Sequence, residues 1–394
     1  MKRERSAIWA FLMLSAAGVG CFAVVDNLYF QGKGYSPATI GALVAVFNIS
    51  VAVSEIPAAV VFDRRSHWLA IQLGNLVRTS ALLLFFLSWG VGADAVAEVL
   101  AGVGAAAMTG TSTAYVLNRL SDEPSAQRIA IGRIAWISAA ASLAGGVIGA
   151  AVFAIDPRTI WLAGATCMAA AGCVFLVGRP RRVSARTKSE PLRRYLRGLG
   201  ALSAHPRAWL SILANAALIA PLILWQLRLG ACSLTAVLLG FAVMKAAGVI
   251  GGRLMSGRRV PRGTLFALIG GNAVAILVFA SCDVPAVILV CFGVHVVAHV
   301  AISVYCSASF QEVVPAHRRA GASSVVSLLS SGLTSIAALA VGVLVDKYSA
   351  LVAVLPSLLL YGLVAVIAAA TSLSARRRTR GHNESPRPVE ATVD

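Results

Sequence analysis

Ionisable side chains interrupt the long apolar stretches of this chain, and they are its candidates for binding or proton-transfer chemistry. A charged group inside a bilayer is costly, so such a residue is by default a functional candidate whose partner should be sought. These residues therefore predict a pathway for a substrate or for protons. The candidates are Asp26, Glu55, Arg78, Glu98, Arg228, Lys245, His295 and His299.

His295 and His299 are four residues apart, a spacing that places both on one face of a helix. Neutral histidine is inexpensive to bury and titrates near physiological pH. The spacing therefore predicts a proton-responsive or substrate-binding pair, with two packed histidines bonded to backbone or hydroxyl groups as the alternative. No third ligand lies nearby in the sequence, so we expect no metal site, and we expect no cofactor.

The remaining candidates differ in their expected depth. Glu55 and Arg78 fall at similar depths on consecutive antiparallel segments, which favours a structural ion pair over a gating or proton-coupling role. Asp26, Glu98 and Arg228 lie toward one end of their segments and could be solvated helix ends. Lys245 has no acidic neighbour in its own half of the chain, so it could snorkel, face a cavity or titrate. A further residue, Pro221, predicts a kink near Trp225 and Gln226.

Twelve apolar segments must position these side chains. A membrane-spanning helix needs about 20 mostly apolar residues to cross a hydrocarbon core of about 30 Å. The chain is 58% hydrophobic and only 13% charged, which predicts an all-α integral membrane protein in contact with a lipid bilayer. The expected spans are 7–28, 37–62, 68–91, 94–117, 130–153, 158–178, 208–229, 232–255, 262–282, 285–308, 320–344 and 349–373.

Positive charge marks one side of these segments. Lys and Arg concentrate in alternate loops and in both tails, as in the run from Arg179 to Arg197, and such loops are typically cytoplasmic. We therefore expect a plasma membrane protein with both termini in the cytoplasm. A net charge of +18 would otherwise suggest a nucleic-acid partner. Because the charge is spread over many short loops, we expect no nucleic acid.

The chain divides into two halves that resemble each other. The pattern Pro-x-x-x-Arg recurs as Pro124 to Arg128 and Pro315 to Arg319, and basic pairs after the second and eighth segments recur at nearly the same offset. This common offset predicts a duplication, with two six-helix bundles related by pseudo-two-fold symmetry. The expected parts are an N-terminal bundle (1–178), a basic cytoplasmic linker (179–206), a C-terminal bundle (207–374) and a disordered tail (375–394).

Two short motifs resemble those of the major facilitator superfamily. The stretch 59–68 contains the Asp63-Arg64 core of the family's loop signature, Gly-x-x-x-Asp-Arg-x-Gly-Arg-Arg, after Glu55-Ile-Pro57. The stretch 98–105 keeps the glycines of a second signature, with Glu98 in place of its Arg. Over residues 1–375 the chain thus resembles this family, which is built from parallel six-span repeats.

This resemblance implies roles for several residues. Asp63 and Arg64 would form a conformational latch at the inner face. The family's cavity-lining spans are the first, fourth, seventh and tenth, and each carries a candidate in this chain. These candidates are Asp26, Glu98, Arg228 and the two histidines, one or more on each of the four cavity spans.

The function predicted from these features is secondary transport by alternating access. We expect a monomer that couples proton entry to efflux of a small amphipathic or drug-like substrate, with Glu98 or Glu55 as proton carrier and Asp26 next. Arg228 and Lys245 suggest the alternative, uptake of a small polar or anionic metabolite. An intramembrane enzyme or receptor is a weaker alternative because no known catalytic motif occurs, so we predict that the chain is not an enzyme.

Overall fold

The computed structural model describes residues 2–62, 67–87, 89–108, 115, 124–177, 200, 203–255, 262–314 and 319–383. Within these residues, twelve helical spans are long and apolar enough to cross a membrane. They match the twelve segments expected from the sequence and confirm the all-α membrane fold class. None of the described residues forms a strand.

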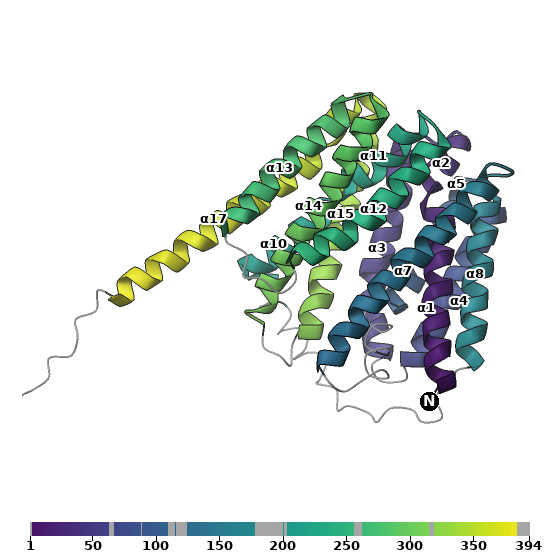
Figure 1. The fold of residues 1–394 in the computed structure, drawn as a ribbon, viewed down its shortest axis with the longest axis horizontal. Coiled ribbons are helices and arrows are strands. Elements are labelled where there is room, and N and C mark those ends of the chain that lie inside the picture. Colours follow the sequence, from purple (N-terminus) through teal and green to yellow (C-terminus); the bar gives the residue numbers. More distant parts are fainter. Residues whose placement is uncertain are drawn as a thin grey trace, which may run out of the picture.

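The first six spans form one bundle, drawn in purple to blue in Figure 1. An aromatic cluster near the end of this bundle away from the N-terminus joins its helices, with the rings of Phe85 and Trp161 stacked at 4.4 Å. Tyr29 and Phe30 complete this cluster, and all four side chains are buried. The helices are α1 (Lys2–Ala23), α2 (Asp26–Gly32), α3 (Pro37–Phe62), α4 (His67–Leu87), α5 (Val91–Met108), α7 (Pro124–Phe153) and α8 (Thr159–Val177).

The last six spans form the second bundle, in green to yellow. The final helix continues to Asn383, so residues 375–383 are helical where the sequence predicted a disordered tail. Its Ala and Arg residues are good helix formers, which explains the extension. The helices are α10 (Pro206–Ala216), α11 (Ile219–Gly230), α12 (Leu234–Met255), α13 (Arg262–Ser281), α14 (Pro285–Gln311), α15 (Arg319–Lys347), α16 (Ala350–Ala353) and α17 (Leu355–Asn383).

The seventh span is discontinuous, because α10 ends at Ala216 and α11 begins at Ile219. Pro221 cannot donate to the carbonyl of Ala217, and its ring clashes with a straight helix at that position. The backbone N–H of Ala220 instead donates to Ser357 Oγ of α17 at 3.2 Å. The break therefore precedes Pro221, and the expected kink near Trp225 is wrong in position.

The two bundles meet along three pairs of helices: α3 with α15, α7 with α12, and α2 with α11. We call the end that carries the N-terminus the basic end, and the other the opposite end (Figure 1). Near the opposite end α3 and α15 are in backbone contact, since a Cβ on Gly41 would lie 2.6 Å from the carbonyl oxygen of Ala338. Glycine is required there because no larger residue fits between the helices.

Candidate functional site

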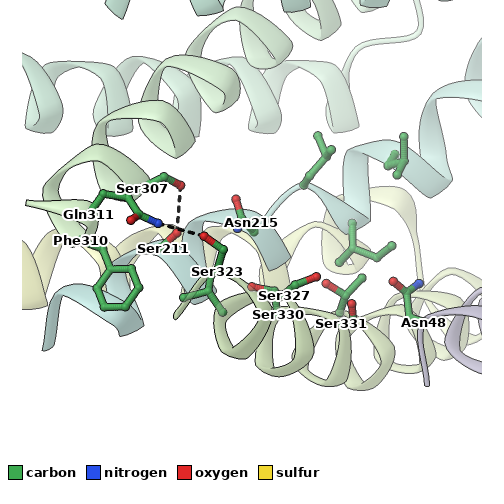
Figure 2. A pocket seen from close by; sticks show the side chains of 15 residues that line it. Asn48, Ser211, Asn215, Ser307, Phe310, Gln311, Ser323, Ser327, Ser330 and Ser331 are labelled. Carbon is green, nitrogen blue, oxygen red and sulfur yellow. Dashed lines mark hydrogen bonds between the residues drawn. The ribbon is translucent and has the colours of Figure 1, made fainter. Parts of the chain in front are cut away.

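A polar cavity of about 440 Å³ lies in the second bundle, beside its contact with the first. Its walls come from α10, α11, α14 and α15, and α3 contributes Asn48 at one edge (Figure 2). The cavity extends from the middle of the spans, at Asn48 and Thr334, toward the basic end at Ser323 and Gln311. Seven of its fifteen lining residues carry hydroxyl groups and three carry amides. The lining residues are Asn48, Ser211, Asn215, Leu218, Ile219, Leu222, Ser307, Phe310, Gln311, Ser323, Val326, Ser327, Ser330, Ser331 and Thr334.

Helix α15 supplies most of the hydroxyls. Ser323, Ser327, Ser330 and Thr334 follow one another at intervals of four, three and four residues, which places them on one face of a helix. Ser331 adds a fifth lining hydroxyl next to this row. The spacing is visible in the sequence, so a search for polar as well as ionisable periodicity would have found this wall.

Some of the lining groups are already satisfied by the protein. Ser211 Oγ and Ser307 Oγ are 3.0 Å apart, and Gln311 Nε2 donates to Ser323 Oγ at 3.0 Å (Figure 2). Behind these residues, Ile212 and Phe310 belong to a small buried apolar cluster that joins α10, α14 and α15. The wall is therefore held in place from behind and by its own hydrogen bonds.

None of the ionisable candidates lines this cavity, but Glu55 touches it through a lining residue. Ser327 Oγ of α15 donates to Glu55 Oε1 of α3 at 2.6 Å, so the bond joins the two bundles. Glu55 is only 8% exposed, and its Oε2 has no partner among the described residues. The expected ion pair with Arg78 is absent from the described contacts, because the carboxylate faces the other bundle.

A second connection between the bundles lies at the opposite end. Gln226 Nε2 of α11 donates to Asp26 Oδ1 at 2.7 Å and to the Ala23 carbonyl at 3.0 Å. Gln226 Oε1 accepts from the backbone N–H of Asn27 at 2.8 Å, and Asn27 Nδ2 donates to the Ile223 carbonyl at 3.3 Å. The break after α1 turns these groups toward α11. We call Asp26, Asn27 and Gln226 the amide bridge.

Glu98 lies near the amide bridge. It is half-buried on α5 and lies within electrostatic range of Asp26 and Asp94. The structure therefore brings together Asp26 and Glu98, two of the predicted candidates, with Asp94 as a third carboxylate. Sequence reasoning missed Asp94, although its carboxylate is completely buried.

Asp94 is held by the loop between α2 and α3. Lys33 Nζ donates to Asp94 Oδ2 at 2.6 Å, and the Tyr35 hydroxyl donates to the same oxygen at 2.7 Å. Burial lowers the pKa of Lys33, but its contacts with Asp94 and Tyr35 together outweigh burial and leave that pKa above its usual value. Burial and the bond to Asp94 raise the pKa of Tyr35. This cluster ties the loop to α5 within the first bundle.

The two histidines face the interior of the second bundle. His295 Nδ1 is 2.8 Å from Asn272 Oδ1 of α13, and His299 Nδ1 is 2.8 Å from the Tyr361 hydroxyl of α17. Both side chains are buried, with ring centroids 6.0 Å apart. They share one face as predicted, and neither histidine lines the hydroxyl-lined cavity. Both histidines are packed in the bundle, and His299 bonds to a hydroxyl group as in the packed alternative, whereas His295 bonds to an amide.

The three basic candidates lie apart from one another. Arg228 donates to the carbonyls of Ala280 at 3.0 Å and Cys282 at 2.6 Å, where it caps the end of α13, and it also pairs with exposed Asp283. Arg78 packs against Gly104 between α4 and α5. Lys245 Nζ lies 4.7 Å from the ring centroid of Phe241. None of these three lines the cavity.

The predicted latch residues, Asp63 and Arg64, lie outside the described residues, as does most of the linker. Among the residues that the structure does describe, no group of three His, Cys, Asp or Glu side chains is placed to hold a metal ion.

A membrane protein of two six-helix bundles with a polar cavity beside their contact has the architecture of a solute transporter. The family model described as Major Facilitator Superfamily matches residues 8–338, and this chain belongs to that family. It is therefore a membrane transporter rather than an enzyme. A search of curated proteins gave no match.

Several solved structures share this fold. The nucleoside transporter NupG aligns with a TM-score of 0.70 and 15% identity over 93% of this chain and 98% of its own. A bacterial homologue of the iron transporter ferroportin, solved in an inward-facing state, aligns with a TM-score of 0.73 and 14% identity. The alignment covers 93% of this chain and 99% of that one. A bacterial homologue of the human lysosomal transporter Spinster aligns with a TM-score of 0.67 and 18% identity, over 95% of this chain and 98% of its own. At these identities the likeness concerns the fold alone.

Proposed function

We propose that this chain is a proton-coupled secondary transporter that works by alternating access as a monomer. The observation that carries this proposal is the asymmetry between the two ends of the bundle contact. The opposite end is closed by the backbone contact at Gly41 and by the amide bridge, whereas a polar cavity extends toward the basic end. A transporter needs a second state in which the opposite end opens.

Distances between spin labels test this second state. Ile155 and Tyr348 are exposed at the opposite end, one in each bundle, and Val177 and Val313 are exposed at the basic end. We define the opposite-end pair as Ile155→Cys with Tyr348→Cys, and the basic-end pair as Val177→Cys with Val313→Cys, in a chain whose native cysteines are replaced. In lipid, we expect a short and a long distance for each pair. When the population of the long distance rises at one end, it should fall at the other. A single distance at both ends under every condition would contradict alternating access.

Glu55 is the proton carrier that we propose. Its Oε1 is bonded across the bundle contact to Ser327, while its buried Oε2 is free to take a proton. Protonation would remove the charge and change the bond to α15, so it would alter the stability of the contact between the bundles. The neighbouring helices carry other charged or titratable groups: Asp26 on α2, His67 and Arg78 on α4, Asp94 and Glu98 on α5 nearer the opposite end, and Arg319, Asp346 and Lys347 at the ends of α15.

The pH dependence of the label distances tests this assignment. The wild-type population should shift between mildly acidic and mildly alkaline buffer, and Glu55→Gln should abolish the shift. Glu312→Gln, which alters an exposed carboxylate at the basic end, is the control and should keep it. A wild-type population indifferent to pH would rule out proton coupling through the bundle contact. A shift that survives in Glu55→Gln and disappears in Glu98→Gln would move the carrier to Glu98.

For the direction we propose export, because the cavity spans are apolar with few charges and the sequence of spans two to five resembles that of drug exporters. We place both termini in the cytoplasm of a plasma membrane. Cells that express the chain should tolerate higher doses of a toxic transported compound, whereas uptake would sensitise them. For the orientation, a membrane-impermeant thiol reagent should label Ile155→Cys in intact cells and spare Val177→Cys. The reverse labelling would invert the topology.

A further inference from the structure

The absence of charge from the hydroxyl-lined cavity bears on what the transporter carries. Each of its fifteen lining residues is polar and uncharged, or apolar. A charged solute that leaves water needs an opposite charge nearby, because removal of an ion from water costs far more than removal of a hydroxyl group. Outside the lining, Glu55 accepts a hydrogen bond from Ser327, and the ion pair of Arg207 with Glu312 at the basic end is already formed within the second bundle.

The cavity nevertheless offers several hydrogen-bonding groups that the protein does not use. Asn215, Ser331 and Thr334 make no side-chain hydrogen bond among the described contacts. Asn215 is exposed although its neighbours Ala214 and Ala216 are completely buried, so its amide projects into the cavity (Figure 2). Gln311 adds a buried Oε1 without a partner. An amide and two hydroxyls can each both donate and accept.

The remaining wall is apolar. Leu218, Ile219 and Leu222 on the broken seventh span line the cavity, as do Phe310 on α14 and Val326 on α15. Its volume of about 440 Å³ falls in the range of ligand pockets for small molecules. The walls together therefore suit a compact frame with both apolar and hydrogen-bonding faces.

We propose that the substrate is an uncharged solute with several hydroxyl or amide groups, bound in this cavity by Asn215, Ser331 and Thr334. This inference rests on the proposed transport function and specifies its substrate class. It narrows the amphipathic or drug-like compound expected from the sequence to an uncharged one with several hydrogen-bonding groups, because ten of the fifteen lining residues carry a hydroxyl or an amide. It also differs from an anionic metabolite, because Arg228 and Lys245 lie outside the lining.

Matched compounds test the substrate class with the purified full-length chain. Glucose, glucuronate and glucosamine share one frame with charges of zero, minus one and plus one, and uridine can be compared with uridine monophosphate. Ligand binding is measured as the rise in the thermal unfolding midpoint, which increases with ligand concentration relative to the dissociation constant. We expect stabilisation by a neutral member, myo-inositol included, and none by its charged counterparts.

Variants then locate the binding. Loss of one hydrogen bond weakens binding by about 2- to 10-fold, which we expect for Ser331→Ala and for Asn215→Ala. Ser335→Ala is the matched control, because Ser335 is bonded within α15 to the Ser331 carbonyl and does not line the cavity. Its affinity should equal that of the wild type.

The result that overturns this inference is stabilisation by none of the neutral compounds, or by a charged compound whose effect Ser331→Ala removes. Glucosamine is the most demanding probe, because Glu55 behind Ser327 could attract a cation. Failure of transport is separately visible: a single label distance at each end would reject alternating access even if a neutral compound bound.

Discussion

The contact between the two bundles is made by different kinds of residue at its two ends. At the opposite end, Gly41 allows α3 and α15 to touch through their backbones, and the amide bridge joins α2 to α11. Toward the basic end, the hydroxyl row of α15 borders a cavity, and a single described side-chain bond, Ser327 to Glu55, joins α3 to α15. Close packing of small residues thus closes one end, while polar side chains keep the other available to a solute.

Gly41→Val should have the largest effect on the closure of the opposite end. A Cβ added at this position would lie 2.6 Å from a backbone oxygen that cannot move alone, so a branched side chain must separate α3 from α15. Overpacking of about 3 kcal/mol corresponds to a shift of about 100-fold in the population closed at the opposite end. The measurement is the distance distribution of the opposite-end pair, in which the short distance should disappear.

The control for Gly41→Val is Gly270→Val, since a Cβ on Gly270 meets nothing within 4 Å. Gly41→Ala should give an intermediate population. A short distance retained in Gly41→Val would show that the backbone contact does not close this end.

Gln226→Ala should have a smaller effect, because it removes the amide bridge and leaves the helices in place. The change deletes the bonds to Asp26, Ala23 and Asn27. Unpaired buried groups cost about 1–2 kcal/mol, so we expect the closed population to fall by about 10-fold in the same label measurement. Gln31→Ala, an exposed glutamine on α2, is the control. Equal populations in both variants would remove the amide bridge from the closure.

Lys33→Met should have the smallest effect on the opening and closing of the two ends, because Lys33 and Asp94 belong to one bundle. We expect the label populations to change by less than about 2-fold, since an ion pair inside one rigid bundle is the same in the two states and does not distinguish them. The variant should lower the thermal unfolding midpoint instead, because Asp94 loses one of its two donors.

The same variant tests a pH dependence. The raised pKa values of Lys33 and Tyr35 mean that the folded state favours the protonated forms of both groups. This stabilisation is complete below their ordinary pKa values and is lost as pH rises through the raised ones. The unfolding midpoint of the wild type should therefore fall more steeply in alkaline buffer than that of Lys33→Met. Parallel curves would contradict the role of this pair.

Much of the architecture could be predicted from the sequence, because a bilayer requires long apolar helices and their lengths can be counted. The candidate site was harder to predict. Ionisable residues drew attention since they are costly in lipid, yet Arg228 caps a helix and His295 packs against Asn272. The residues that line the cavity are mostly serines, which are unremarkable in composition and significant only through their common helix face.

The sequence by itself determined the twelve spans, the duplicated halves and the family, since each depends on local hydropathy or on short motifs. Only the tertiary structure decided which polar groups meet. Glu55 and Ser327 are 272 residues apart in the chain, and Asp26 and Gln226 are 200 apart. Their contacts depend on how two bundles pack against each other, and side-chain periodicity within one helix carries no information about a partner in the other bundle.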